Sequence, residues 1–197
     1  MSAIATRARV CRRRGHGREM MFRVILSITA GVLLSAAAHG QAADQYQLKA
    51  AFLYNFAKFV EWPLKTFKGA ADPIAICVLG KDPVEDALRQ TASGKAIDGR
   101  PFSIREIPDA QHASGCHILF IAASDAKRTL EALDFVRGAA ILTVGESEGF
   151  AAEGGIINFK MEGGRAKLQI NPDAADRSKL CISSKRLSLA EIVKDRK

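Results

Sequence analysis

The chain has 197 residues and a formal net charge of +8 at pH 7. Residues 1–42 contain seven Arg, no Lys and one Glu, so they carry +6 of this charge; the remaining 155 residues, with 22 basic and 20 acidic side chains, carry only +2. The excess positive charge therefore belongs to the N-terminal segment. The nearly neutral remainder of the chain gives no support for nucleic-acid binding.

The first 42 residues have the order of a secretory signal peptide. A basic stretch precedes the uncharged apolar run 24–38, and small residues follow it. This run of 15 residues is shorter than the roughly 20 that a membrane helix needs. We expect cleavage after Ala42 and export to the periplasm; a start codon at Met20 or Met21 and an uncleaved signal anchor stay open. Residues 43–197 are expected to form a single domain.

The first element of the mature chain is a predicted helix over residues 45–63. Its apolar residues recur at three- and four-residue steps, Asp44 can cap its start, and Pro63 stops it because the residue before a proline avoids helical angles. The helix carries six aromatic residues, including the single tryptophan of the chain. We assign the face that Phe52, Phe56 and Phe59 share to the core.

The strands of the next hundred residues are predicted from apolar runs and from alternation. Runs that are apolar throughout indicate strands covered on both faces. Four segments that are either apolar throughout or alternate between apolar and polar residues are predicted as strands: 74–80, 101–107, 116–124 and 139–146. Two more strands are predicted within 156–171, around the Gly163–Gly164 turn.

Helices are predicted between these strands. The segment 82–92 begins with Asp82 as N-cap and Pro83 at the first helical position. The segment 125–138 follows Ser124 as a cap, with Leu130, Leu133 and Val136 on one face. A short helix is predicted from Asn171–Pro172, and helical period over 184–193 ends the chain. The fold class is therefore α/β, a three-layer sandwich in which a mostly parallel sheet is flanked by helices, with a C-terminal β-hairpin.

The sequence contains little support for a catalytic site or a metal-binding site. The mature chain has two histidines, His112 and His117, and no zinc-type cysteine spacing. Gly80 follows a strand, but the glycines of a dinucleotide fingerprint are missing. Ser124 and Lys127 have the Ser-x-x-Lys spacing of penicillin-binding proteins without their partner motifs. We expect no enzyme, no metal and no cofactor.

The cysteines carry more information. The mature chain has Cys77, Cys116 and Cys181. An oxidising compartment favours a disulfide, and neighbouring parallel strands could bring Cys77 and Cys116 within bonding range. The alternative is a pair of inert buried thiols. If the bridge forms, Cys181 is the odd thiol.

Several phrases together resemble the YfiR family of exported proteins, also called the DUF4154 family. They occur in order from about residue 45 to residue 193: "LKAAFLYNFAKFVEWP", "ICVLG", "GRPFSIRE", "CHILFIAAS", "LTVGESEGFAAEGGIINF" and "CISSKRLSLAEIV". The resemblance implies a non-catalytic three-layer domain. It also implies a periplasmic repressor that binds the periplasmic sensor domain of an inner-membrane diguanylate cyclase and lowers cyclic-di-GMP synthesis, with effects on biofilm formation.

The resemblance has further implications for partners and disulfides. An outer-membrane lipoprotein sequesters such repressors, and homodimers are expected. Cys77 and Cys116 match the family's pair that links two strands. Some members have a second pair after the "GE…GF" phrase, where this chain has no cysteine. Cys181 does not correspond to that second pair, so it is a buried thiol or an intermolecular link.

Candidate partner-binding residues are the aromatics outside the core stripe and some basic residues near the C-terminus. They are Tyr54, Trp62, Arg177, Lys185 and Arg186. Large aromatics near a surface are frequent anchors of protein interfaces. The alternatives are that Trp62 closes the end of the core and that the basic residues are simply solvated. A different function also stays open: a periplasmic small-molecule-binding accessory protein of another membrane sensor or a transporter.

Overall fold

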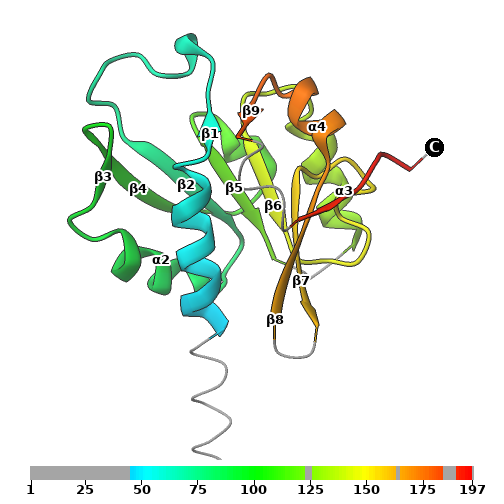
Figure 1. Cartoon of the computed structure of the whole chain (residues 1–197). Coiled ribbons are helices and arrows are strands. Elements are labelled where there is room, and N and C mark those ends of the chain that lie inside the picture. The colour runs from blue at the N-terminus through cyan, green and yellow to red at the C-terminus, as the bar shows by residue number, and fades with distance from the viewer. Residues whose placement is uncertain (1–44, 123–125, 163–164, 184–189, 197) are drawn as a thin grey trace, which may run out of the picture. The chain divides into compact units, whose positions relative to one another are not determined.

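A computed structural model of the chain describes residues 45–122, 126–162, 165–183 and 190–196 (Figure 1). All of them lie in one compact unit, Asp44–Lys197. The predicted signal peptide, the caps Asp44 and Ser124, and the Gly163–Gly164 turn lie outside the described residues.

An eight-stranded sheet forms the centre of this unit. In the described part of the chain, each of its seven neighbouring pairs of strands is in register over two to six residues. The spatial order is β10 (Glu191–Ile192), β8 (Arg165–Ile170), β7 (Ile157–Glu162), β6 (Leu142–Gly145), β5 (Ile118–Ile121), β2 (Ile74–Leu79), β4 (Arg100–Ile107) and β3 (Ala96–Ile97). Only the pairs β7–β8 and β3–β4 are antiparallel. The predicted mostly parallel sheet with a hairpin near the C-terminus is confirmed.

Helices cover both faces of the sheet, so the three predicted layers are present (Figure 1). Alternate residues of β2 point to opposite faces: Ile76 and Val78 pack with the N-terminal helix and α2 (Val84–Ala92), whereas Cys77 and Leu79 pack with η2 (Ala110–Ala113) and α3 (Ala126–Phe135). β2 is buried along its whole length, as its uninterrupted apolar sequence predicts.

The N-terminal helix ends earlier than predicted. It covers residues 45–56, a turn follows at 57–59, and Val60–Glu61 form strand β1. β1 pairs antiparallel with β9 (Cys181–Ile182), a partner 120 residues away that overrides the local helical period. The sequence placed the stop at Pro63, where a short 3-10 helix, η1 (Leu64–Thr66), begins instead.

The buried face of this helix is also rotated from the predicted one. Ala50, Leu53 and Ala57 are its most buried residues, and Phe56 is buried beside them. Phe52 and Phe59 are only half-buried. Ala50 and Leu53 allow the helix to approach the sheet closely, and the rings of Phe52 and Phe56 contact Phe159 of β7, with centroids 5.4 Å and 5.7 Å apart.

Helix starts follow the predicted capping chemistry where the structure describes them. Asp82 Oδ1 accepts a hydrogen bond from Val84 N at 2.8 Å, and Asn171 Oδ1 accepts one from Ala174 N at 3.0 Å at the start of α4 (Pro172–Arg177). The predicted apolar face of α3 is wrong in one residue. Leu130 is 42% exposed, because the face against the sheet is formed by Thr129, Ala132 and Leu133.

Two segments gain strands that the sequence did not indicate. Residues 94–100, predicted as a loop, contain β3 and a two-residue turn at Asp98 and Gly99, both with positive φ, as in hairpins that follow the twist of a sheet. At the C-terminus, Glu191 and Ile192 form β10 beside β8 rather than part of a helix. Only this end of the predicted helix 184–193 lies within the described residues. Its backbone pairs in parallel with β8, Glu191 with Gln169 and Ile192 with Ile170.

Candidate functional site

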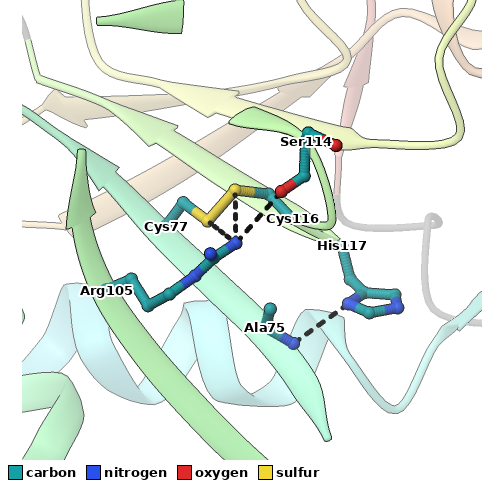
Figure 2. Close-up of a disulfide and its surroundings, with 6 residues drawn as sticks. All are labelled: Ala75, Cys77, Arg105, Ser114, Cys116 and His117. Atoms are coloured by element: carbon teal, nitrogen blue, oxygen red, sulfur yellow. Dashed lines mark hydrogen bonds between the residues drawn. A yellow bond between two sulfur atoms is a disulfide. The ribbon is translucent and has the colours of Figure 1, made fainter. Parts of the chain in front are cut away.

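The structure contains the predicted disulfide (Figure 2). Cys77 lies in β2 and Cys116 two residues before β5, the neighbouring strand, and their Cα atoms are 5.9 Å apart. Both residues are buried. The bridge therefore joins two parallel central strands whose connection in the chain runs through α2 and β4. It fixes their relative position on the face of the sheet that α3 covers.

Arg105 contacts both sulfur atoms of this bridge. It lies on β4, where its Cα pairs in register with Cys77. One terminal nitrogen of its guanidinium lies 3.5 Å from Cys77 Sγ and 3.4 Å from Cys116 Sγ, and it donates to the Ser114 carbonyl at 3.3 Å (Figure 2). The side chain of Arg105 thus links β4 to the bridge and to the loop before β5.

His117, the residue after Cys116, faces the opposite side of the sheet from the disulfide. Its Nδ1 accepts a hydrogen bond from Ala75 N at 3.0 Å (Figure 2), and its ring stacks on Phe67 with centroids 4.4 Å apart. Because Nδ1 is an acceptor, the neutral ring carries its proton on Nε2. Burial, helped by the positive charge of Arg100, holds the pKa of His117 below its ordinary value. The side chain is thus a neutral part of the core.

Trp62 lies beside this histidine at the end of the sheet. Its ring is half-buried, with centroids 6.3 Å from Phe67 and 6.0 Å from His117. Within the described part of the chain, neither Trp62 Nε1 nor His117 Nε2 has a hydrogen-bond partner, although both atoms are buried. Two N–H donors in one aromatic cluster therefore lack an acceptor.

Tyr54, the other aromatic candidate, lies on the flank of the N-terminal helix. It is half-buried, its ring centroid is 5.2 Å from that of Phe102, and the ammonium groups of Lys58 and Lys95 lie 4.5 Å and 4.9 Å from its ring centroid. The ring is thus covered by cations on its outer side. The structure does not bring Tyr54 and Trp62 together in any described contact.

Arg177 makes an ion pair within the chain. Its guanidinium binds both carboxylate oxygens of Asp195, which also accepts from Asn171 Nδ2 at 2.7 Å. The hydrogen bond from Arg177, reinforced by the bond from Asn171, lowers the pKa of Asp195. These contacts hold the C-terminal segment against α4. Lys185 and Arg186 lie outside the described residues, and Cys181 is an exposed free cysteine at the start of β9.

An apolar cavity of about 370 Å³ opens beside the N-terminal helix. Its walls come from the helix, from the β7–β8 hairpin and from β1 and β9. The lining includes the half-buried phenylalanines that the sequence assigned to the core, together with a few polar groups: Phe52, Asn55, Phe56, Phe59, Leu168, Ile170 and Ser183. A mostly apolar concavity of this size is typical of sites for small molecules.

Two of these features, the contact of Arg105 with the disulfide and the cavity, have no signal in the sequence. Arg105 sits in an alternating strand, and only the register of β4 against β2 shows that it reaches the disulfide. The cavity depends on how the helix and the hairpin approach each other. The alternation of the strand does predict that Arg105 shares a face with Ser103 rather than with Ile104, which is as far as the pattern leads.

No helix in the described ranges is long and apolar enough to cross a membrane. Those residues also contain no group of three or more metal-ligating side chains placed to hold an ion.

Among known protein families, a family model described as YfiR/HmsC-like matches residues 46–191 of this chain. A solved structure, a conserved domain protein from Vibrio cholerae O1 biovar El Tor str. N16961, is similar with 13% sequence identity and a TM-score of 0.43. That likeness covers 61% of this chain and 54% of the other, so the chain spans about half of its length. A comparison with curated protein sequences gave no match.

Proposed function

This chain belongs to the YfiR/HmsC-like family, and we propose that it binds the periplasmic sensor domain of an inner-membrane diguanylate cyclase and represses cyclic-di-GMP synthesis. The family is one of periplasmic, regulatory, non-enzymatic proteins of diguanylate cyclase signalling. The observation that carries the proposal is the match over residues 46–191, which spans almost all of the folded unit.

Repression by binding is a population shift. The regulator must bind the inactive state of the sensor domain more tightly than the active state, because a ligand with equal affinity for both changes neither population. The bridge between β2 and β5 supports this function, since a rigid surface loses less conformational entropy when it binds. Homodimers and an outer-membrane lipoprotein that sequesters the repressor belong to the same proposal.

The test is a pull-down of the protein, starting at Ala43, with the periplasmic domain of a membrane-bound diguanylate cyclase from the same organism. We expect a stable complex under oxidising conditions. Reductant and the Cys77→Ser variant should weaken it, whereas Cys181→Ser, which removes the exposed free thiol, serves as the matched control and should not. Absence of a complex in both redox states would contradict the proposal.

The cavity supports a second candidate function, a small-molecule-binding accessory protein. Its walls are mostly apolar, with Asn55 and Ser183 as the polar groups that would orient a ligand. A library of small apolar and aromatic compounds, screened by thermal unfolding, should then yield ligands that raise the melting temperature. Ala166→Leu, which places a larger side chain in the cavity, should abolish that rise. Ligands that stabilise both forms equally would contradict a site in this cavity.

A further inference from the structure

β4 lies near one edge of the sheet, and its outer side is only partly covered (Figure 1). On its inner side, the six residues from Phe102 to Ile107 pair in register with β2. On its outer side, β3 pairs with Arg100 and Pro101 alone. Beyond Pro101, no strand of the described part of the chain covers the outer side of β4.

The direction of the backbone groups along this edge follows from one hydrogen bond. Ile107 O accepts from Gly80 N, at the end of β2, at 2.8 Å. Successive residues of a strand direct their N–H and C=O groups to alternate sides, so Ile107 and Arg105 face β2. Ile104 and Glu106 therefore present their N–H and C=O groups outward. No hydrogen bond among the described residues uses these four groups.

An open groove of about 460 Å³ runs beside this edge, between β4 and the end of α2. Phe102 and Ile104, both half-buried, supply its apolar part. The charged residues of its lining are Arg89, which is ion-paired with Glu85 on α2, and Lys95, which supplies the net positive charge of the groove. The groove is therefore complementary to a segment that combines apolar and acidic side chains.

We propose that an extended acidic segment of a partner protein binds here by adding a strand to the edge of β4. Its backbone would bond with Ile104 and Glu106, and its alternate side chains would enter the groove, apolar ones against Phe102 and acidic ones toward Lys95. Strand addition of this kind draws affinity from main-chain hydrogen bonds and specificity from side-chain pockets. The inference rests on the proposed function, for which it supplies the docking surface of the sensor domain.

The same strand is tied to the disulfide. Arg105 lies between the two residues whose backbone faces outward, and its guanidinium contacts both sulfurs. The contact links a side chain of the docking strand to the bridge, while the register of β4 on β2 fixes the position of the strand itself.

Two of the registers in which a second copy of the chain could pair with this edge are unfavourable. Antiparallel pairing of two β4 strands about Arg105 would place two arginines opposite each other, and pairing about Glu106 would oppose two carboxylates. Like charges directly across a sheet are destabilising.

The test is the substitution Glu106→Pro in the protein from Ala43 onward, with the sensor domain as the probe. Proline removes the outward N–H without removing any bond to β2, since Glu106 faces away from that strand. The matched control is Ile192→Pro. Ile192, 53% exposed, occupies the corresponding outward position at the opposite edge of the sheet, because Val193 N bonds to Ile170 O.

We expect Glu106→Pro to weaken sensor-domain binding by at least about tenfold while Ile192→Pro leaves it unchanged. Glu106→Ala, which removes the carboxylate and keeps the backbone N–H, measures the contribution of the side chain to binding separately from that of the N–H. Equal binding by Glu106→Pro and Ile192→Pro, with a complex still formed by the wild type, would overturn the docking surface but leave the proposed function intact. Loss of a homodimer in Glu106→Pro with sensor binding intact would overturn it too and assign the edge to a second copy.

Amide hydrogen exchange is the independent readout. The amides of Ile104 and Glu106 should exchange quickly in the free protein and slowly in the complex. A complex in which both still exchange as in the free protein would overturn the proposal, whatever the variants do. A wild-type protein that forms no complex with the sensor domain in either redox state would overturn both the proposed function and this inference.

Discussion

The two faces of the sheet are held in different ways. On the face under α3, the disulfide joins β2 to the start of β5, and the buried ring of Phe150 fills the space above two glycines, Gly145 and Gly155. On the opposite face, the N-terminal helix and the β7–β8 hairpin leave a cavity of about 370 Å³. We call these the bridged face and the open face.

We expect the bridged face to contribute more to stability and the open face to adapt more easily to a bound molecule or partner. The bridged face has a covalent link, and the Phe150 ring leaves no space for a Cβ atom at Gly145 or Gly155. The open face has half-buried aromatic rings and a cavity, so side chains there can move or be covered at lower cost. The four predictions below test whether this contrast in packing is also a contrast in energy.

Removing the disulfide should have the largest effect. The double variant Cys77→Ser/Cys116→Ser should lose about 4 kcal/mol of unfolding free energy, because the 39-residue separation of the cysteines sets the chain entropy that the bridge removes from the unfolded state. Denaturant unfolding measures this loss. Cys181→Ser is the control and should lie within about 0.5 kcal/mol of the wild type. A loss below about 1 kcal/mol in the double variant would mean that the bridge does not stabilise the bridged face.

Adding one methyl group under Phe150 should have the next largest effect. A Cβ at Gly155 would overlap the Phe150 ring, which is fully buried and cannot move aside. We expect Gly155→Ala to cost about 2–3 kcal/mol by overpacking. Gly94→Ala is the matched control: it has open space around it and a φ of +66°, so only backbone strain of about 1 kcal/mol should appear. Equal losses in thermal unfolding would refute the tight packing of Phe150.

The same substitution on the two faces should have opposite signs. Ala113→Leu, in η2 against the sheet, should lower stability by about 1–2 kcal/mol because Ala113 is only 2% exposed. Ala166→Leu, in the wall of the cavity, should leave stability unchanged or raise it by about 0.5 kcal/mol. Chemical denaturation of both variants checks the difference. A comparable loss in each would show that the open face is as closely packed as the bridged one.

The smallest effect should be the pH dependence from His117. Its folded pKa lies below its unfolded value of 6.5, because burial disfavours the charged ring and protonated Nδ1 cannot accept from Ala75 N. The unfolded state therefore binds the proton more readily, so this contribution to stability is complete above about pH 6.5 and is lost as the pH falls toward the folded pKa.

Melting temperatures between pH 7.5 and pH 5 are the measurement. His117→Gln should flatten the profile over that range, and His112→Gln, which changes an exposed side chain, should retain it. A profile that flattens in the His112 variant instead would contradict this prediction, because the titration would then belong to His112 and not to His117.

Much of the fold could be predicted because its signals are local. Fully apolar runs gave the central strands, since strands covered on both faces need no polar residues. Asp82 and Asn171 marked helix starts through side-chain hydrogen bonds to backbone groups within three residues. The Cys77–Cys116 bridge followed from two strands that were expected to be neighbours.

The predictions that failed concern segments with distant partners. Val60 has helical neighbours in sequence, but it pairs with Ile182. Glu191 continues a helical pattern, yet it lies beside Gln169 in the sheet. In both cases the backbone hydrogen bonds of a strand partner outweigh a weak local preference. The face of α3 was misassigned at Leu130 because the pattern alone cannot tell a smaller residue such as Ala132, at the true contact, from a larger exposed one.

The sequence by itself determined the α/β class, the apolar strands, two helix caps and the pair of cysteines, because each depends on residue types at short spacing. Tertiary structure alone decided that Arg105 reaches the disulfide, that the N-terminal helix leaves a cavity against the hairpin, and that no strand among the described residues covers the outer edge of β4 beyond Pro101. These features depend on strand register and strand order. Both are set by contacts between segments tens of residues apart, which no local pattern records.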